Sequence, residues 1–131
     1  MRLWKVLLRA LGVEGAVVQG VRLDDLDELV FDVRPDTRGG KRPRCGVCAA
    51  ISPVYDQGWG RRRWRAPDLG TVKAWLEAEA PRVRCEGHGV VVAQFAWARH
   101  DNGFTRAFEE TVAWLATHTS KSALGELMRV A

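Results

Sequence analysis

Three cysteines and one histidine are the residues of this chain whose types and spacing indicate a particular chemistry. Cys45 and Cys48 are separated by two residues, and so are Cys85 and His88. A tight turn of that length aims two side chains at one metal ion, and two such turns complete a tetrahedral Zn²⁺ site. Three thiolates and one imidazole leave no open position on the ion, so we expect a structural zinc and not a hydrolytic one.

The alternative is that the three cysteines are present by chance, either free or in a disulfide. An odd number of cysteines and no recognisable signal peptide disfavour a disulfide. The 36 residues between the two pairs exceed the spacing within a single zinc finger. We therefore expect a small sheet between the two turns, which is the arrangement of a zinc ribbon.

Positive charge is concentrated around the first cysteine pair. The chain carries a net charge of +4, but residues 38–65 hold eight basic residues against Asp56 alone, with Tyr55, Trp59 and Trp64 among them. Arginines clustered with aromatic residues are typical of proteins that bind a phosphate backbone. The predicted phosphate contacts in this segment are Arg42, Arg44, Arg61, Arg62, Arg63 and Arg65.

Other interpretations of this segment stay open. In one interpretation, the basic strand is simply solvated and the tryptophans pack beneath it. We favour this interpretation for Trp64. In another, the chain is a protein-interaction adaptor with Trp59 and Trp64 as the partner surface. Salt dependence separates DNA binding from an apolar interface, because phosphate binding weakens steeply with salt. A metalloenzyme is disfavoured because four protein ligands fill the metal site and no free acid–base pair accompanies them.

Periodicity predicts the elements that position the cysteine pairs. A stripe of leucines with Trp4 indicates a helix over residues 2–11, which ends at Gly12. Residues 15–23 and 28–34 are expected to be strands joined by an acidic turn, and residues 51–56 a short strand after the first cysteine pair.

The pattern of residues 71–80 is ambiguous. Apolar and polar residues alternate there as in a strand, but the residue types favour a helix. We predict a strand, because Leu69 and Gly70 form a turn that folds it back on residues 61–66, and because it must deliver Cys85 to the metal. Residues 90–95 are then one more strand that leaves the second pair.

The pattern of the last part of the chain predicts two helices. One spans about residues 104–115 with Thr105 as its cap, and the second spans residues 121–129 with Thr119 or Ser120 as its cap. The residues expected to face inward from the second helix are Ala123, Leu124, Leu127 and Met128. Two short helices joined by a few polar residues indicate the opening of a helix-turn-helix, with a plain helical hairpin as the alternative.

The start of the second of these helices is a further candidate phosphate site, because helix N–H groups favour anions. Its residues are Ser120, Lys121 and Ser122. The predicted fold class is α+β: a small antiparallel sheet with a zinc ribbon, followed by a helical pair. We expect divisions at residues 1–34, 35–98 and 103–131. The longest apolar stretch, residues 89–98, is well short of the ~20 residues that span a bilayer, so we expect a soluble, cytoplasmic protein.

Several spaced motifs follow one another from about residue 30 onward. They are Cys45-x2-Cys48, Trp64-Arg-Ala-Pro-Asp-Leu-Gly70, Arg82-Val-Arg-Cys85-x2-His88-Gly89-Val, Trp97-Ala-Arg, Phe104-Thr-Arg-Ala-Phe108, Val112-Ala-Trp-Leu115 and Ser120-Lys-Ser-Ala123. In this order they resemble bacterial insertion-sequence transposases of the ISL-three group. Many members have cysteine as the fourth ligand, and this chain resembles the variant with Cys-x2-His-Gly.

The resemblance implies a zinc-binding ribbon followed by a helix-turn-helix, which together bind the terminal inverted repeats of the element. Double-stranded DNA is thus the expected partner, with self-association as a further possibility. Family members continue into a ribonuclease-H-like domain that carries their catalytic acids. We carry over no catalytic residue, and expect this chain to be a truncated gene copy or an N-terminal fragment without enzymatic activity.

Overall fold

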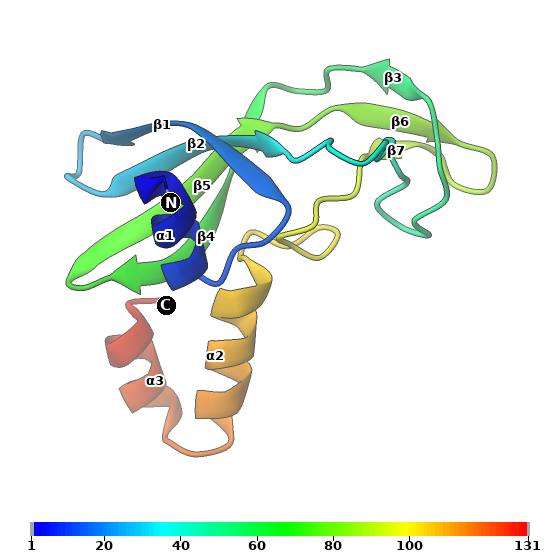
Figure 1. Cartoon of the computed structure of the whole chain (residues 1–131). Coiled ribbons are helices and arrows are strands. Elements are labelled where there is room, and N and C mark those ends of the chain that lie inside the picture. The colour runs from blue at the N-terminus through cyan, green and yellow to red at the C-terminus, as the bar shows by residue number, and fades with distance from the viewer. Residues whose placement is uncertain (1, 131) are drawn as a thin grey trace.

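A computed structural model describes residues 2–130, and it arranges them as one helix, seven strands and two further helices (Figure 1). The elements are α1 (Leu3–Ala10), β1 (Ala16–Leu23), β2 (Leu29–Pro35), β3 (Val54–Asp56), β4 (Arg61–Leu69), β5 (Val72–Glu79), β6 (Arg82–Cys85), β7 (Gly89–Val92), α2 (Arg106–Ala116) and α3 (Lys121–Met128). The predicted α+β class is confirmed.

Four strands form the larger sheet in the order β1-β2-β5-β4. The pairs β1–β2 and β4–β5 are antiparallel hairpins, whereas β2 and β5 run parallel, from Leu29 opposite Ala74 to Asp32 opposite Glu77. This sheet is therefore mixed. The antiparallel pairing that we predicted holds for its two hairpins but not for the pair β2–β5. The chain between β2 and β5 is long enough to return in the same direction, which a short hairpin turn does not allow. The sheet thus joins β1 and β2, from the N-terminal part of the chain, to β4 and β5, from the predicted ribbon segment.

The ambiguity over residues 71–80 is resolved in favour of the predicted strand. Ala74 and Leu76 are fully buried on one face of β5, while Glu77 and Glu79 lie on the other. Gly70, with a φ of +61°, makes the turn that folds β5 back on β4. Pairing on both edges and burial of one face outweigh the helical propensity of these residue types.

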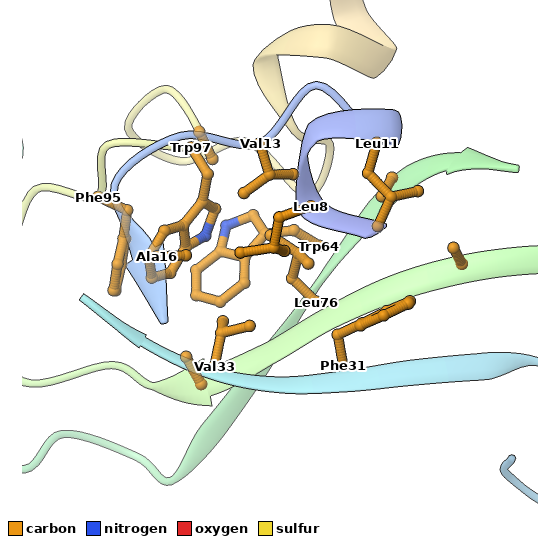
Figure 2. Close-up of a cluster of buried hydrophobic side chains, with 14 of the residues drawn as sticks. Leu8, Leu11, Val13, Ala16, Phe31, Val33, Trp64, Leu76, Phe95 and Trp97 are labelled. Atoms are coloured by element: carbon orange, nitrogen blue, oxygen red, sulfur yellow. The ribbon is translucent and has the colours of Figure 1, made fainter. Parts of the chain in front are cut away.

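The core lies between the larger sheet and α1, as Figure 2 shows. Trp64 of β4 is 0% exposed, and its ring makes edge contacts with Phe95 and Trp97 at centroid distances of 4.7 and 5.5 Å. Trp64 is thus a core residue, as we favoured, and the prediction that it forms a partner surface is wrong. From α1, Leu8 and Leu11 are buried in this core.

The smaller sheet has the order β3-β6-β7, is antiparallel, and lies at one end of the larger one (Figure 1). Its outer strands are shorter than predicted. Residues Ser52 and Pro53 precede β3, and a proline cannot donate a ladder hydrogen bond. Beyond Val92 the chain leaves the sheet and delivers Phe95 to the core of the larger sheet.

The caps predicted for the last two helices are confirmed. Thr105 accepts a hydrogen bond from the Phe108 N–H, and Ser120 accepts one from the Ala123 N–H. The two helices form a pair below the larger sheet in Figure 1. Of the α3 residues predicted to face inward, Leu124 and Met128 are partly buried but Ala123 and Leu127 are exposed. The reason is that α3 packs along one narrow side only, so that an apolar groove between α2 and α3 stays open.

A polar link joins the helical pair to β4. The Asp68 carboxylate accepts hydrogen bonds from Arg65 and Arg129, and Arg65 also donates to the Met128 carbonyl at 3.3 Å. The end of α3 is thereby fixed against the larger sheet. Across residues 2–130, no helix has the length and apolar character needed to cross a membrane.

Candidate metal centre and nucleic-acid interface

The first cysteine turn is closed by its own backbone. The Cys45 N–H donates to the Ala50 carbonyl at 2.8 Å, and the Ala49 N–H donates to the Cys45 carbonyl at 2.9 Å. Ala49 adopts a left-handed conformation with a φ of +64°. The Val47 N–H points at the Cys45 sulfur at 3.3 Å. These bonds turn the chain within four residues, so that both thiols face the same side.

The second turn is the hairpin between β6 and β7. Cys85 pairs with Gly89, whose φ of +71° is easily adopted by glycine. The His88 side chain, and then the Gly87 N–H, lower the pKa of the Cys85 thiol to about 6. The thiolate is the form of cysteine that binds a metal, so this shift favours Cys85 as a ligand.

Contacts of the first turn with the end of β7 and the residues that follow it bring the two pairs together. The Gly46 N–H donates to the Val92 carbonyl at 3.2 Å, and the Gln94 N–H donates to the Arg44 carbonyl at 2.8 Å. A Cβ at Gly46 would lie 2.5 Å from both the Val92 oxygen and the His100 Nδ1. Only glycine allows this close approach, and the approach places the first turn beside the β6–β7 hairpin.

The four predicted ligands, Cys45, Cys48, Cys85 and His88, lie together, with their ligand atoms all within 4.8 Å of one another. The Cys48 and Cys85 sulfurs are 3.7 Å apart, and the His88 Nδ1 lies 3.6 Å from Cys85 and 3.9 Å from Cys45. Tetrahedral zinc with bonds of about 2.3 Å to sulfur and 2.0–2.1 Å to nitrogen requires separations of about 3.8 and 3.6 Å. The side chains therefore fit a structural zinc ion.

The other two histidines lie elsewhere. His100 packs beside Gly46, on the outside of the first turn, and its Nε2 lies 3.4 Å from Asp101. His118 stacks on Trp114 at the end of α2, with ring centroids 4.0 Å apart. Neither is part of the group formed by the cysteines and His88.

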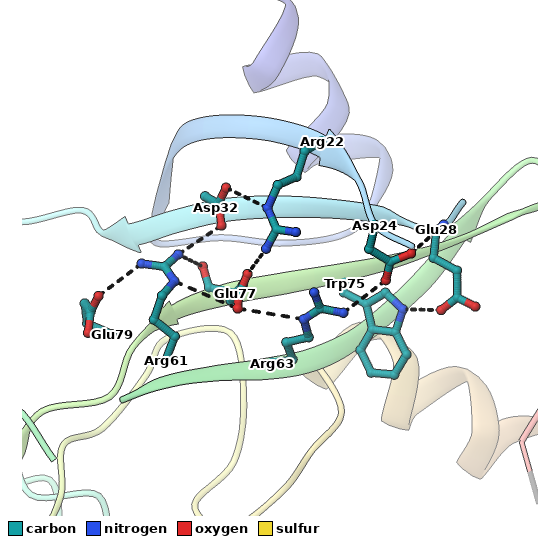
Figure 3. A network of polar contacts seen from close by, with 9 residues as sticks. All are labelled: Arg22, Asp24, Glu28, Asp32, Arg61, Arg63, Trp75, Glu77 and Glu79. Carbon is teal, nitrogen blue, oxygen red and sulfur yellow. Dashed lines mark hydrogen bonds and ion pairs between the residues drawn. The ribbon is translucent and has the colours of Figure 1, made fainter. Parts of the chain in front are cut away.

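The arginines of β4 meet acids that are distant in the sequence (Figure 3). Arg61 forms ion pairs with Asp32 at 3.0 Å and with Glu79 at 3.1 Å. Arg63 pairs with Asp24 at 3.1 Å, and Glu77 lies between Arg61 and Arg63 at 3.9 and 3.8 Å. The acids come from β2, β5 and the turn between β1 and β2.

Arg65 is the most enclosed of these arginines. It is 3% exposed, forms an ion pair with Asp68 at 2.8 Å, and lies over the Phe108 ring. The folded chain thus engages Arg61, Arg63 and Arg65 internally. Counting eight basic residues against one acid along residues 38–65 does not describe the folded surface, because the acids that neutralise this strand lie outside that segment.

The remaining predicted arginines are placed differently. Arg42 and Arg44 are exposed beside the first cysteine turn, and within residues 2–130 neither forms an ion pair. The Arg62 side chain projects from the opposite face of β4, donates to the Asn102 carbonyl at 2.8 Å, and lines a hollow of about 40 Å³ together with Arg99 and Arg106.

Arg99 and Arg106 were not predicted from the sequence. The signal was present, because they are the arginines of the Trp97-Ala-Arg and Phe104-Thr-Arg motifs, but spacing alone did not show that they converge on Arg62. The predicted site at Ser120, Lys121 and Ser122 lies on the helical pair. The Ser120 hydroxyl serves there as the helix cap, and Lys121 and Ser122 are exposed.

Fold and site together define a zinc ribbon, because two turns on an antiparallel sheet present Cys-x2-Cys and Cys-x2-His to one point. Residues 41–88 match the family described as the zinc-finger of transposase IS204/IS1001/IS1096/IS1165. The predicted resemblance to the N-terminal zinc-ribbon region of ISL-three transposases is thereby confirmed.

Two curated relatives extend this similarity along the whole chain. Both are described as the transposase for insertion sequence element IS1557, one from Mycobacterium tuberculosis strain CDC 1551 / Oshkosh and one from strain ATCC 25618 / H37Rv. Each is 44% identical over 137 aligned residues, which cover 100% of this chain and 30% of the relative. The chain therefore spans about 30% of the length of the curated relatives it matches. No solved structure shows a significant match.

Proposed function

We propose that this chain is a DNA-binding segment of a transposase and that it binds the terminal inverted repeats of its element. The observation that carries the proposal is a zinc ribbon of the transposase type whose first turn presents the exposed Arg42 and Arg44, which have no acidic partner among residues 2–130. Both matched relatives are named as transposases of an insertion sequence, which supports the same role.

The predicted phosphate contacts divide into two groups after folding. We retain Arg42, Arg44 and Arg62 as contacts with the DNA backbone, and add Arg106, which shares the hollow with Arg62; Arg99 lines the same hollow but is paired with Glu109 at 3.5 Å. A zinc ion in the ribbon would fix the two turns and thereby hold Arg42 and Arg44 in place. Preorganised arginines lose less side-chain freedom when they bind a phosphate.

The second group acts through the fold. Arg61 and Arg63 hold β4 against the neighbouring strand and the β1–β2 turn, and Arg65 holds it against the end of α3. We keep Ser120, Lys121 and Ser122 as a separate contact, in which Lys121 and Ser122 meet a phosphate at the start of α3.

We assign no catalytic role to the residues of this chain. The acids that lie close together, Asp24, Asp32 and Glu77, are all bonded to arginines on the larger sheet. Each of these carboxylates already has an arginine partner, which disfavours its use as a metal ligand. The part proposed for this chain is to hold the transposon end, not to cut it.

The test is binding of the zinc-loaded chain to a terminal inverted repeat and to a scrambled duplex, each at several salt concentrations. Replacing Arg42 and Arg44 together by Ala should weaken binding and lower the slope of log K against log salt by about 2, one for each phosphate contact. The matched control replaces Lys5 and Arg9, two exposed basic residues of α1, by Ala.

Equal losses in the two double variants would show that net charge, and not the ribbon, attracts the DNA. Absence of duplex binding by the wild-type chain at low salt would overturn the proposal. Preference for the inverted repeat over the scrambled duplex is the result expected of a segment that recognises transposon ends.

A further inference from the structure

One face of the smaller sheet carries an exposed group of aromatic rings and arginines that the proposed duplex contacts do not use. Trp59 follows β3 and is 91% exposed, and Tyr55 of β3 is about half exposed. The Arg82 guanidinium lies 5.5 Å from the Tyr55 ring and 5.4 Å from the Trp59 ring. Arg84 lies 5.0 Å from the Tyr55 ring. Two rings and two cations therefore form one continuous surface.

The turn that carries Trp59 is fixed by the backbone. Gly58 and Gly60 flank it with φ values of +70° and +107°, and the Gly58 N–H donates to Asp56 Oδ1 at 2.9 Å. A Cβ at Gly58 would lie 2.4 Å from the Ala80 carbonyl oxygen. The turn is thus packed tightly against the chain beneath it, while the indole that it presents faces solvent.

Charges on this face favour an anionic partner. Asp56 follows Tyr55 in β3, and its carboxylate is paired with the Arg82 guanidinium through two contacts, one of them Nε to Oδ1 at 2.9 Å. Arg84 is exposed and forms no ion pair within residues 2–130. The surface thus combines flat apolar rings with one cation that is free to meet a phosphate.

The geometry points to a site for single-stranded DNA, in which unpaired bases stack on Trp59 and Tyr55 while Arg84 meets a phosphate. Aromatic rings beside a positively charged track are the elements with which proteins bind single strands. Bases within a duplex hide their flat faces from such rings, so only an unpaired base can use them. The inference rests on the proposed DNA-binding function and adds a second form of DNA, bound by residues that the proposed duplex contacts do not include.

The experiment measures fluorescence anisotropy of a labelled twelve-nucleotide oligothymidine and, separately, of a labelled duplex, with the full zinc-loaded chain. Trp59→Ala should weaken single-strand binding roughly 5- to 150-fold, the range found when one stacking residue is replaced by alanine. Tyr55→Ala should act in the same direction, and Trp59→Phe should retain most of the affinity. Duplex affinity should change less than twofold in each variant.

The matched control is Trp114→Ala, which removes an exposed tryptophan that stacks on His118 at the far end of α2. Its single-strand affinity should equal that of the wild type. Zinc content and circular dichroism of every variant show whether the fold is retained, and Trp59 lies on the surface, where truncation leaves the core intact.

Three results would overturn the inference. One is single-strand binding that survives Trp59→Ala and Tyr55→Ala, and another is a parallel loss for single strand and duplex. The third is a wild-type chain that ignores the single strand but forms dimers that Trp59→Ala abolishes, which would make this face a protein contact. Duplex binding is measured in its own arm, so failure of the proposed function is recorded independently.

Discussion

Glu77 is the central acid of the arginine network on the larger sheet, and replacing it by Gln tests whether that network stabilises the fold. The Glu77 side chain is 15% exposed and meets three arginines: Arg22, Arg61 and Arg63 (Figure 3). Glutamine has nearly the same shape, so the variant removes the charge without leaving a cavity.

The expected loss follows from the exposure of the partners. The three arginine side chains are 37–44% exposed, and ion pairs that open to solvent each contribute about 0.3–1 kcal/mol. Three such pairs give about 1–3 kcal/mol of lost unfolding free energy. For a chain of this length that corresponds to a decrease in Tm of roughly 4–12 °C.

The matched control is Glu79→Gln on the same strand. Glu79 is 56% exposed and, within residues 2–130, pairs with Arg61 alone, so its replacement should cost well under 1 kcal/mol. Thermal unfolding of both variants, with zinc saturating and at low and high salt, gives the comparison. The difference between them should shrink in high salt, because salt screens partly exposed pairs.

The same variant tests whether folding neutralises the β4 arginines. Removing the Glu77 charge leaves Arg63 with Asp24 as its remaining partner, and duplex DNA should then bind more tightly and with a steeper salt slope than to the wild type. A Glu77→Gln chain that is no less stable than Glu79→Gln would refute the stability argument. Unchanged DNA affinity would refute the view that the acids neutralise this strand.

Three further predictions concern the metal and the link between sheet and helices. The chain should bind one Zn²⁺, and chelation or Cys85→Ser should unfold it, because structural zinc supplies about 10–16 kcal/mol of folding free energy in zinc-finger peptides. Metal-free protein, verified by metal analysis, that unfolds at the same temperature as the zinc-loaded chain would contradict this. Zinc should be retained in His88→Cys and in His100→Ala but lost in His88→Ala. Loss of zinc from His100→Ala and its retention in His88→Ala would show that the ligand set is wrong. Burial raises the pKa of Asp68, but Arg129 and Arg65 outweigh it and hold that pKa below 3.8, its unfolded value. The contribution of Asp68 to stability is therefore complete above that value and is lost as the pH falls through the lower, folded pKa. Urea unfolding should show the wild type more stable than Asp68→Asn at pH 7, with a difference that shrinks below about pH 4; a difference that widens on acidification would contradict the sign.

The sequence by itself determined the features that depend on neighbours along the chain. The ligands Cys45, Cys48, Cys85 and His88 were predicted from spacing, because a turn with two intervening residues directs both of its side chains to one point. Helix caps and hairpins follow the same logic, since a cap bonds an N–H three residues away and a hairpin needs only its turn residues.

Tertiary structure alone decided which charges and rings are available to a partner. The acids that engage Arg61 and Arg63 lie 14–39 residues from them along the chain, and no local pattern shows that they meet. Parallel pairing of β2 with β5 brings Asp32 opposite Glu77, and this pairing places the acids beside Arg61 and Arg63. An ion pair depends on distance in space, so a charge count along the sequence overestimated the basic surface.

The two tryptophans of the basic segment show the same limit. Trp59 and Trp64 are five residues apart and belong to one run of arginines and aromatics, yet one is 91% exposed and the other 0%. Trp64 is buried because α1 and the chain after β7 close over its face of β4. Among residues 2–130, no element packs over Trp59, because the turn that carries it follows the edge strand of the smaller sheet. Residue type set the chemistry of both side chains, and the packing of distant elements decided which of them faces solvent.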